Sequence, residues 1–206
     1  MAKLSFNRDF EPAYGTAVQV SPLVRRLTCN NPSAFTFTGT GSYIVGEGNV
    51  AVIDPGPDDD RHLDSILAAV DGETVSHIVI THTHRDHSPL ATRLQKITGA
   101  RTYGYGPHGA GARARAIAAG DVQLDASGDV NFDPDVNVSD GDIIEGAGWR
   151  LEALFTPGHC SNHLAFALPQ ENALFCGDHV MAWSTSVIAP PDGNMADYFA
   201  SLDKLM

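Results

Sequence analysis

The chain of 206 residues is predicted to be an α/β protein with mixed β-sheets and helices packed outside them. The order of the predicted elements is strands, a helix, a strand, a helix and then more strands, which is typical of sheets covered by helices. Hydrophobic residues make up 43% of the chain and charged residues 18%. That composition is globular and argues against disorder, collagen or a coiled coil. The length suits one domain with a sizeable core and no need for disulfides.

The first elements are strands separated by glycine turns. Strands are expected over residues 35–38, 42–45 and 50–54, and Gly46-Glu47-Gly48-Asn49 fits a hairpin turn between the last two. Residues 58–70 follow, and their apolar side chains recur at helical spacing. These patterns predict a short antiparallel unit that leads into an amphipathic helix.

A short β-branched run at residues 76–80 predicts a buried strand that leads directly into a polar segment. Leu90, Leu94 and Ile97 then share one face of a second expected helix, which ends near Gly99. The following stretch is rich in Gly, Ala and Asp. In it we expect a short helix over residues 110–119 and a loop over residues 125–135.

The last third of the chain returns to strands, expected over residues 143–144, 149–155, 163–168 and 173–176. A final helix over residues 196–206 ends on an apolar turn, with no glycine cap and no polar tail. A helix that ends in this way usually has further residues to pack against. The chain is therefore predicted to be a fragment of a longer one.

Charge and composition limit the partners and the location. Thirteen Lys and Arg residues against 25 Asp and Glu residues give a formal net charge of -12. This excludes a broad nucleic-acid footprint, although a bound dication would reverse the sign locally. No apolar run is long enough to span a membrane, and the N-terminus lacks the apolar core of a secretory signal. The three cysteines are far apart, which favours a reducing cytoplasm.

Four metal-ligand side chains follow the strand at residues 76–80. His82 and His84 are two residues apart, so a strand-like backbone places them on the same side. Asp86 and His87 fall on a turn that can curl around a second ion. Imidazole and carboxylate groups suit zinc and its neighbours. The pattern predicts a metal site, and the alternative interpretation is a polar turn with incidental histidines.

The pattern His82-x-His84-x-Asp86-His87 resembles the signature of the metallo-β-lactamase superfamily. Thr156-Pro157-Gly158-His159 resembles the later metal-binding His of that family, and Cys176-Gly177-Asp178 resembles its bridging Asp. Asp54-Pro55-Gly56 resembles its early turn. These elements occur in the right order across about residues 40–180. The resemblance implies a four-layer αββα sandwich with the site at one edge of its two sheets.

The resemblance also implies a site for two divalent metal ions. One ion would be held by His82, His84 and His159, and the second by Asp86, His87 and Asp178, with Asp178 touching both. In such a site a bridging hydroxide attacks a carbonyl carbon or phosphorus while one metal stabilises the oxyanion. Asp86 would also orient the nucleophile. Zinc is the expected metal, and iron or manganese would also fit a ligand set without thiolate.

The implied reaction is hydrolysis of an ester, thioester, lactam or phosphodiester. Two departures from the family bear on it. An Asp stands at position 178, where zinc β-lactamases often have Cys, and no His follows His179 to complete the second metal site. A truncated chain explains the missing ligand. Alternatively His163, His179 or water takes its place. His163 and His179 otherwise lie behind the ligands or on the substrate side, or have a structural role.

Residues 81–91 and 176–193 resemble the endoribonuclease-like "β-lactamase-like protein 2" branch of the superfamily. Members of that branch typically carry a C-terminal winged-helix region, which would begin where this chain stops. Residues 1–206 are then expected to form one metallo-β-lactamase-like domain that acts on single-stranded RNA or a small molecule. A basic C-terminal part could supply the phosphate contacts. The alternatives are a metal-poor, inactive module and a binding component of an RNA-processing assembly.

The segment Gly104–Gly109 matches the letters G-x-G-x-x-G. A dinucleotide site needs this pattern at a tight turn between a strand and a helix. Pro107 and the weak flanking strand argue against that arrangement. No organic cofactor is therefore expected, and the segment is interpreted as a loop.

Overall fold

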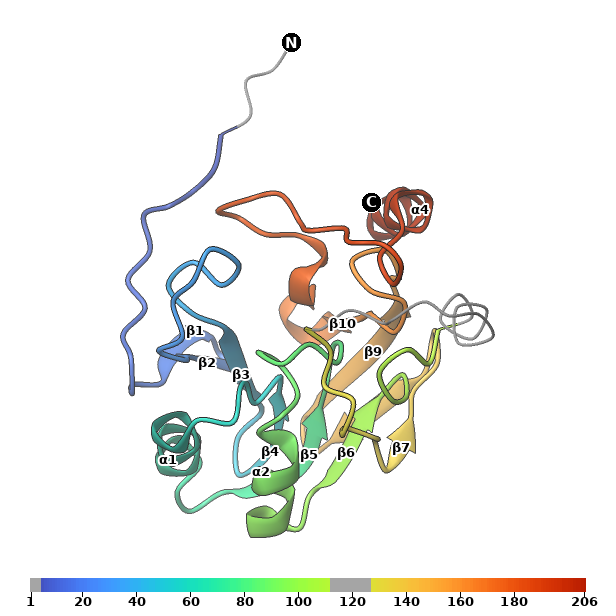
Figure 1. The fold of residues 1–206 in the computed structure, drawn as a ribbon. Helices are drawn as coiled ribbons and strands as arrows, with labels where there is room; N and C mark the ends of the chain where they lie inside the picture. Colours follow the sequence, from blue (N-terminus) through green and yellow to red (C-terminus); the bar gives the residue numbers. More distant parts are fainter. Residues whose placement is uncertain (1–4, 112–126) are drawn as a thin grey trace.

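A computed structural model describes residues 5–111 and 127–206, which form two β-sheets packed face to face (Figure 1). The first sheet has seven strands in chain order. Neighbouring strands are antiparallel from β1 to β4 and parallel from β4 to β7. The strands are β1 (Val18–Ser21), β2 (Val24–Thr28), β3 (Gly41–Val45), β4 (Asn49–Ile53), β5 (Thr74–Val79), β6 (Arg101–Gly104) and β7 (Val136–Asn137).

The second sheet has four antiparallel strands in the order β11-β10-β9-β8. Short 3-10 turns follow two of them: η1 (Pro169–Glu171) after β10, and η2 (Gly177–His179) after β11. The second of these turns carries the predicted bridging Asp. The strands are β8 (Ile143–Gly146), β9 (Trp149–Phe155), β10 (Leu164–Leu168) and β11 (Ala173–Phe175).

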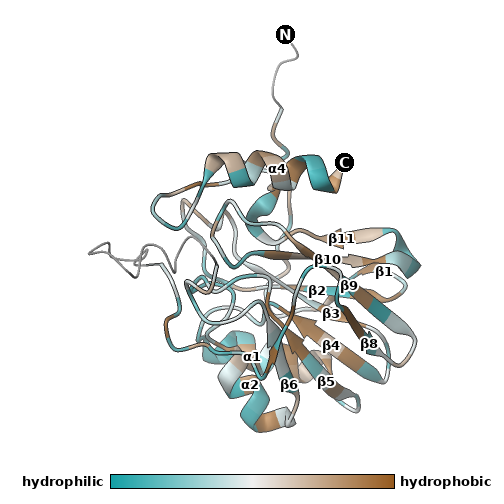
Figure 2. Cartoon of the chain, turned by 90° about the vertical axis from the view of Figure 1, so that its right-hand side faces the viewer, coloured by the Kyte–Doolittle hydropathy of each residue, from teal (hydrophilic) through white to brown (hydrophobic). Residues whose placement is uncertain are grey.

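Helices α1 (Asp60–Ala69) and α2 (Ala91–Thr98) cover the outer face of the first sheet (Figure 2). The Asp59 carboxylate caps α1 by accepting the N–H of His62 at 2.8 Å, which satisfies one free donor of the first turn. Helix α4 (Met195–Leu205) lies at the far end of the molecule, close to the second sheet (Figure 2). None of the helices in the described part of the chain is long and apolar enough to cross a membrane.

Two apolar layers hold this arrangement together. Because successive strand residues point to opposite faces, β4 supplies Val52 to the layer under the helices and Ile53 to the layer between the sheets. Trp149 fills much of the inter-sheet layer and donates its indole N–H to the Asn49 carbonyl at 2.9 Å. The hydrophobic strands that face one another across this layer are visible in Figure 2. This packing holds the two sheets together, and the loops at one end of the sandwich can therefore carry the side chains of a site.

The predicted fold of mixed sheets with flanking helices is confirmed. Helices α1 and α2 form the helical layer that covers the first sheet. Helix α4 packs on the loop after β9, where the Ser201 hydroxyl donates to the Pro157 carbonyl at 2.7 Å. About one turn further along α4, Lys204 pairs with Asp140 in the segment before β8. Helix α4 is thereby joined to the loop that carries His159.

Some local predictions are wrong. Residues 35–38 form a turn and not a strand, because the Ser33 hydroxyl accepts the N–H groups of Phe35 and Thr36, both at 3.1 Å. The strands β1, β2 and β6 were not predicted, since two adjacent arginines interrupt the apolar pattern of β2 and the others are short. Most of the helix predicted over residues 110–119 lies outside the described residues.

Gly158→Ala is expected to be strongly destabilising. Gly158 has φ +145°, and a Cβ there would lie 2.4 Å from the Cα of Tyr198 in α4. The added methyl group would push α4 away from the loop that holds His159, at a cost of about 2 kcal/mol or more. Chemical denaturation measures this cost. Gly72→Ala is the control, because Gly72 has φ +78° but no atom within 4 Å of the added Cβ. An equal loss in both variants would contradict the packing argument.

His62 is expected to make the fold acid-sensitive. Burial lowers the pKa of His62 to about 4, against an ordinary value of 6.5. Between these values the unfolded chain binds a proton that the folded chain does not, so the free energy of unfolding falls as the pH falls through that window. The ring accepts or donates a 2.8 Å hydrogen bond with the Ser42 hydroxyl, which Gln can replace. The pH slope measured by denaturation should be smaller in His62→Gln than in the wild type, and equal slopes would contradict the account.

Candidate metal centre

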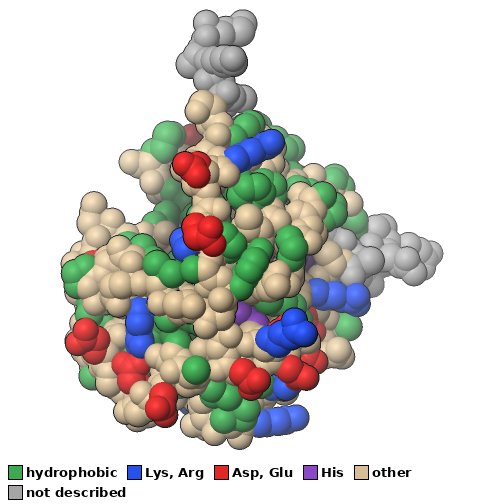
Figure 3. Space-filling model, turned by 90° about the vertical axis from the view of Figure 1, so that its left-hand side faces the viewer, with side chains coloured by type: hydrophobic (Ala, Val, Ile, Leu, Met, Phe, Trp, Pro, Cys, Tyr) green, Lys and Arg blue, Asp and Glu red, His purple; other side chains and the backbone are tan. Residues whose placement is uncertain are grey.

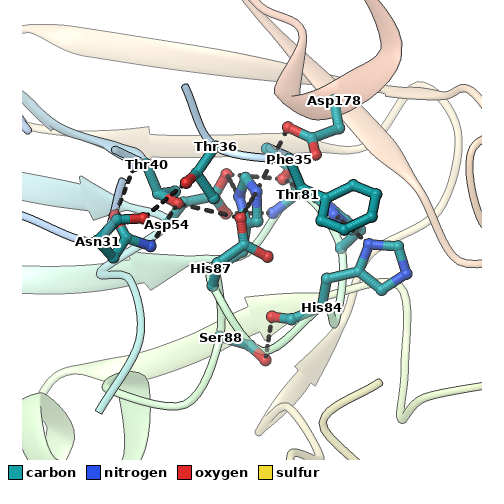
Figure 4. Close-up of polar contacts among 12 residues, drawn as sticks. Asn31, Phe35, Thr36, Thr40, Asp54, Thr81, His84, His87, Ser88 and Asp178 are labelled. Atoms are coloured by element: carbon teal, nitrogen blue, oxygen red, sulfur yellow. Dashed lines mark hydrogen bonds and ion pairs between the residues drawn. The ribbon is translucent and has the colours of Figure 1, made fainter. Parts of the chain in front are cut away.

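The predicted site residues come from three loops at one end of the sandwich. Residues 81–88 follow β5, residues 156–163 connect β9 to β10, and η2 follows β11. Strands β4 and β5 are parallel, so Asp54 and Thr81 emerge at the same edge of the first sheet. Figure 4 shows Asp178 facing His84 and His87 across the space where these loops meet. The structure therefore brings together side chains that are up to about half the chain apart.

Three imidazole nitrogens converge at the centre of this site. The Nδ1 atom of His84 lies 3.0 Å from Nε2 of His82 and 2.9 Å from Nε2 of His159. These three buried rings form a group whose ligand atoms all lie within 4.8 Å of one another. The opposite nitrogen of His159 lies 2.6 Å from the Val187 carbonyl, which can only accept. His159 Nδ1 therefore donates to this carbonyl, which directs Nε2 of the same ring into the group.

The electrostatics keep this group in its metal-binding form. Burial, followed by the neighbouring imidazoles, lowers the pKa of His82 well below its ordinary value and that of His84 to about 3. Both rings are therefore neutral at pH 7. Neutral imidazoles can offer nitrogen lone pairs to a cation at the centre of the group. The donor set fits a metal ion on chemical grounds.

A second group lies beside the first and adds carboxylates. His82, His87 and Asp178 offer ligand atoms within 4.8 Å of one another. The Nε2 atom of His87 is 3.3 Å from Asp86 Oδ2 and 3.4 Å from Asp178 Oδ1. The other oxygen of Asp178 lies 3.7 Å from His159 Nε2, so this carboxylate faces both groups. This is the position that the resemblance implied for a bridging ligand.

Opposite charges dominate the second group. Burial alone would lower the pKa of His87, but Asp86, Asp178 and Asp54 together raise it well above its ordinary value. Burial likewise opposes ionisation of Asp86 and Asp178, yet His87 holds the pKa of both carboxyls below their usual range. The carboxylates attract a proton to His87 in the absence of another cation. A dication would satisfy the same negative charge and displace that proton.

Asp54 anchors the site from behind. One of its oxygens accepts the Thr81 N–H and the other accepts the Thr81 hydroxyl, both at 2.7 Å. The second oxygen also lies 3.0 Å from Nδ1 of His87 and so directs Nε2 of that ring toward the centre. The sequence indicated Asp54 only as part of a turn. Its φ of +48°, which is uncommon for a residue other than Gly, is an independent sign of a constrained functional position.

Asp86 is held by a second network from the loop before β3. The Thr40 hydroxyl donates to Asp86 Oδ2 at 3.0 Å and accepts from the Asn31 amide at 3.1 Å (Figure 4). The Asn31 amide oxygen in turn accepts the Thr40 N–H at 2.9 Å. Neither Asn31 nor Thr40 was predicted as a site residue, since nothing in their local sequence indicates the contact. They fix the orientation of the Asp86 carboxylate.

His163 and His179 lie behind the site and do not join either metal-binding group of the described residues. His163 Nδ1 bonds the Thr156 hydroxyl at 2.9 Å, and its ring is 5.1 Å from that of His82. Its Nε2 lies directly under Gly177, where a Cβ would approach it to 2.7 Å. His179 is fully buried against Tyr198. Both rings therefore pack behind the ligands, and a role for either residue on the substrate side or as the missing ligand stays a prediction.

Two cavities meet at the candidate metal centre. One, of about 540 Å³, is reached past Asp86, His87 and Asp178 and extends along β2 and β11. The other, of about 480 Å³, adjoins it and is lined by His84 and His159. The loop segment Phe35–Thr36 and Met181 border both cavities. A substrate can therefore extend in two directions from a bond placed at the centre.

Residues 36–206 match the metallo-beta-lactamase superfamily, and this region contains every histidine and aspartate described above. The chain belongs to that superfamily. The family match covers more than four-fifths of the sequence, so the assignment rests on the whole domain and not on the histidine motif alone. It confirms the superfamily resemblance predicted from the sequence.

Among the curated relatives, the chain is 30% identical to an atrochrysone carboxyl ACP thioesterase from Aspergillus terreus, over 90% of the chain and 52% of that protein. Other fungal relatives are named as thioesterases of the same kind or as lactamase-like proteins. The chain spans about half the length of the curated relatives it matches. These relatives do not support the endoribonuclease-like branch that residues 81–91 and 176–193 suggested.

Solved structures share the fold. A β-lactamase domain protein from Burkholderia ambifaria superposes with a TM-score of 0.73 at 22% identity, covering 96% of this chain and 66% of that one. TTHA1623, solved in a di-iron-bound form, superposes with a TM-score of 0.63 at 25% identity, covering 87% and 84% of the two chains. The first likeness establishes the sandwich fold alone. The second protein binds two iron ions on a fold of this kind.

Proposed function

We propose that this chain carries the active site of a metal-dependent hydrolase that cleaves thioesters. One observation carries the proposal: neutral imidazole nitrogens and two ionised carboxylates converge where two cavities meet. Burying such a donor set is costly without a cation, and apolar residues would serve a purely structural role better. At this position a bound ion would contact the middle of an elongated substrate.

The ligand assignment combines the two groups with Asp86, which belongs to neither of them but lies 3.3 Å from Nε2 of His87. His82, His84 and His159 would hold one ion, while Asp86, His87 and Asp178 would hold the second, with Asp178 shared. Bound dications polarise an attacked carbonyl and acidify water, which is the chemistry that hydrolysis at neutral pH needs. Zinc and iron both fit these ligands, as does manganese.

The protein itself orients the reactants. Asp86 Oδ2 accepts from Thr40, whereas Asp86 Oδ1 has no partner among the described residues and stays available to accept a proton from the attacking water. Asp54 prevents the His87 ring from turning away. The acyl group would occupy one cavity and the thiol arm the other, which places the thioester carbonyl between the two carboxylates.

A thioester is the preferred substrate because the Aspergillus terreus relative is an acyl-carrier thioesterase. The net charge of -12 argues against single-stranded RNA, since polyanions are repelled on average. Only half of that relative is matched, so the carrier protein and the natural acyl group are parts of the proposal that need separate tests.

The test compares metal-loaded and metal-stripped protein on matched substrates. We expect zinc or iron to restore hydrolysis of acyl N-acetylcysteamine thioesters after chelation, with little activity on the matched oxygen esters, on lactams or on a single-stranded oligonucleotide. Asp178→Asn should remove the activity. Preferential cleavage of the oligonucleotide would favour the RNA hypothesis, and equal thioesterase rates with and without metal would contradict the proposal.

A further inference from the structure

The larger cavity has the walls of a binding site for a ring-shaped or long apolar group. It extends from the metal centre between the inner face of β2 and β3 and the segment after β11. Phe37 and Trp183 both line it and stack on each other, with ring centroids 5.4 Å apart. Tyr43 and Phe175 meet edge to face at 5.2 Å further along the same wall. In the space-filling view of this side, hydrophobic side chains gather beside the N-terminal segment (Figure 3).

A row of polar atoms without partners runs along the same wall. Ser21 Oγ, Arg26 Nε and Thr28 Oγ1 are buried and have no hydrogen-bond partner within residues 5–111 and 127–206, and all three residues line the cavity. Arg26 and Thr28 share the inner face of β2, because alternate strand residues point the same way. A buried polar atom without a partner is costly, so native proteins rarely keep three of them in one wall unless water or a ligand binds there.

Among the described residues, Arg26 is the one Lys or Arg on this wall, and no carboxylate of that part of the chain pairs with it. Its guanidinium lies over the Phe10 ring at 4.3 Å and reaches the Glu11 carbonyl only at 3.4 Å. Apart from His87 at the metal end, the other charged groups of the wall are acidic: Asp9 on the N-terminal segment, and Asp54, Asp86 and Asp178 at the metal end. An unpaired guanidinium facing a cavity is a site for an anionic oxygen.

Resting on the proposed function, we infer that this cavity receives the acyl part of the thioester and that Arg26 selects acyl groups carrying a carboxylate remote from the reacting carbonyl. The aromatic walls contact the apolar body of the acyl group. Thr28 lies at the metal end of β2, since it pairs with Gly41 next to Thr40. Arg26 is two residues further away, about 7 Å along the strand. The remote carboxylate therefore meets Arg26 while the carbonyl stays at the metal centre.

The experiment uses pairs of N-acetylcysteamine thioesters of arylalkanoic acids that differ only in a terminal carboxylate or its neutral carboxamide. We expect the metal-loaded wild type to prefer the carboxylate by about tenfold to a hundredfold in kcat/KM, the range of a charge-assisted hydrogen bond. Arg26→Gln should remove this preference, so that the two substrates of each pair are turned over with similar kcat/KM. Arg26→Lys, which keeps the charge and the contact with Phe10, should retain part of the preference.

Arg61→Gln is the control, because Arg61 lies on α1 outside both cavities and its loss changes the net charge equally. No preference in the wild type, or a preference that persists in Arg26→Gln, would overturn the inference. Calorimetry with the corresponding amides, which are not cleaved as thioesters, separates the two proposals. Binding of the carboxylate amide that depends on Arg26, without any thioester hydrolysis, would support the cavity assignment and overturn the proposed reaction.

Discussion

Replacing His84 with alanine is expected to abolish hydrolysis and to remove at least one metal ion per chain. The Nδ1 atom of His84 lies between the Nε2 atoms of His82 and His159, so its loss leaves two ligands where three converged. The expected fall in kcat/KM is at least about a thousandfold, because the ion and the carbonyl position are lost together. The measurement is a rate assay combined with elemental analysis of the same purified sample.

His77→Gln serves as the matched control. His77 lies on β5 against Tyr103 and Trp149, away from both metal-binding groups. This variant also removes one histidine but should keep its metal and its activity. Full activity in His84→Ala would contradict the proposed mechanism. An equal loss of activity in both variants would mean that the assay reports a loss of stability and not a loss of metal ligation.

Replacing Asp54 with asparagine is expected to weaken the second metal site by about tenfold to a hundredfold, the usual cost of losing a partner that orients a metal-binding histidine. Asp54 accepts from Thr81 and from Nδ1 of His87. An amide can keep one contact with Thr81, but it removes the charge that holds the His87 ring. Titration of the metal-stripped protein with zinc should show one site nearly unchanged and one site weakened.

Asp58→Asn is the control for this experiment. Asp58 lies four residues along the chain, is exposed and pairs only with Arg93 among the described residues. Its replacement removes the same charge and should leave both metal affinities unchanged. Unchanged zinc binding in Asp54→Asn would contradict the role assigned to this carboxylate.

The parts of the fold that follow from local patterns were predicted well. The strand at residues 149–155 is β9, and the expected helices near residues 58–70 and 196–206 are α1 and α4. In these segments the apolar spacing alone decides the conformation. The prediction of a strand at residues 35–38 was wrong because one hydroxyl, that of Ser33, stabilises a turn against it.

The site residues that lie close together in the sequence could be predicted from their pattern. His82, His84, Asp86 and His87 occupy one short loop, and the structure brings them together with His159 and Asp178. The residues that orient these ligands were not predictable. Thr40 meets Asp86 across 46 positions of sequence and Asp54 meets His87 across 33. Such contacts depend on how β3, β4 and β5 pair, which no local pattern shows.

The misassigned branch has a physical explanation. Residues 81–91 and 176–193 surround the metal-binding groups, where the chemistry of the ions constrains the choice of side chain whatever the substrate is. Discrimination between substrates depends instead on the cavity walls. Arg26 and Phe37 come from parts of the chain that the resemblance did not use.

Metal content per chain tests the central claim most directly. Elemental analysis of protein purified without chelator should give about two ions per chain for the wild type, falling in His84→Ala but not in His77→Gln. Two ions would mean that the described ligands, with water, complete the second site without a downstream histidine. A wild type that stays metal-free after incubation with zinc, iron and manganese would contradict the account, and the converging histidines would need another explanation.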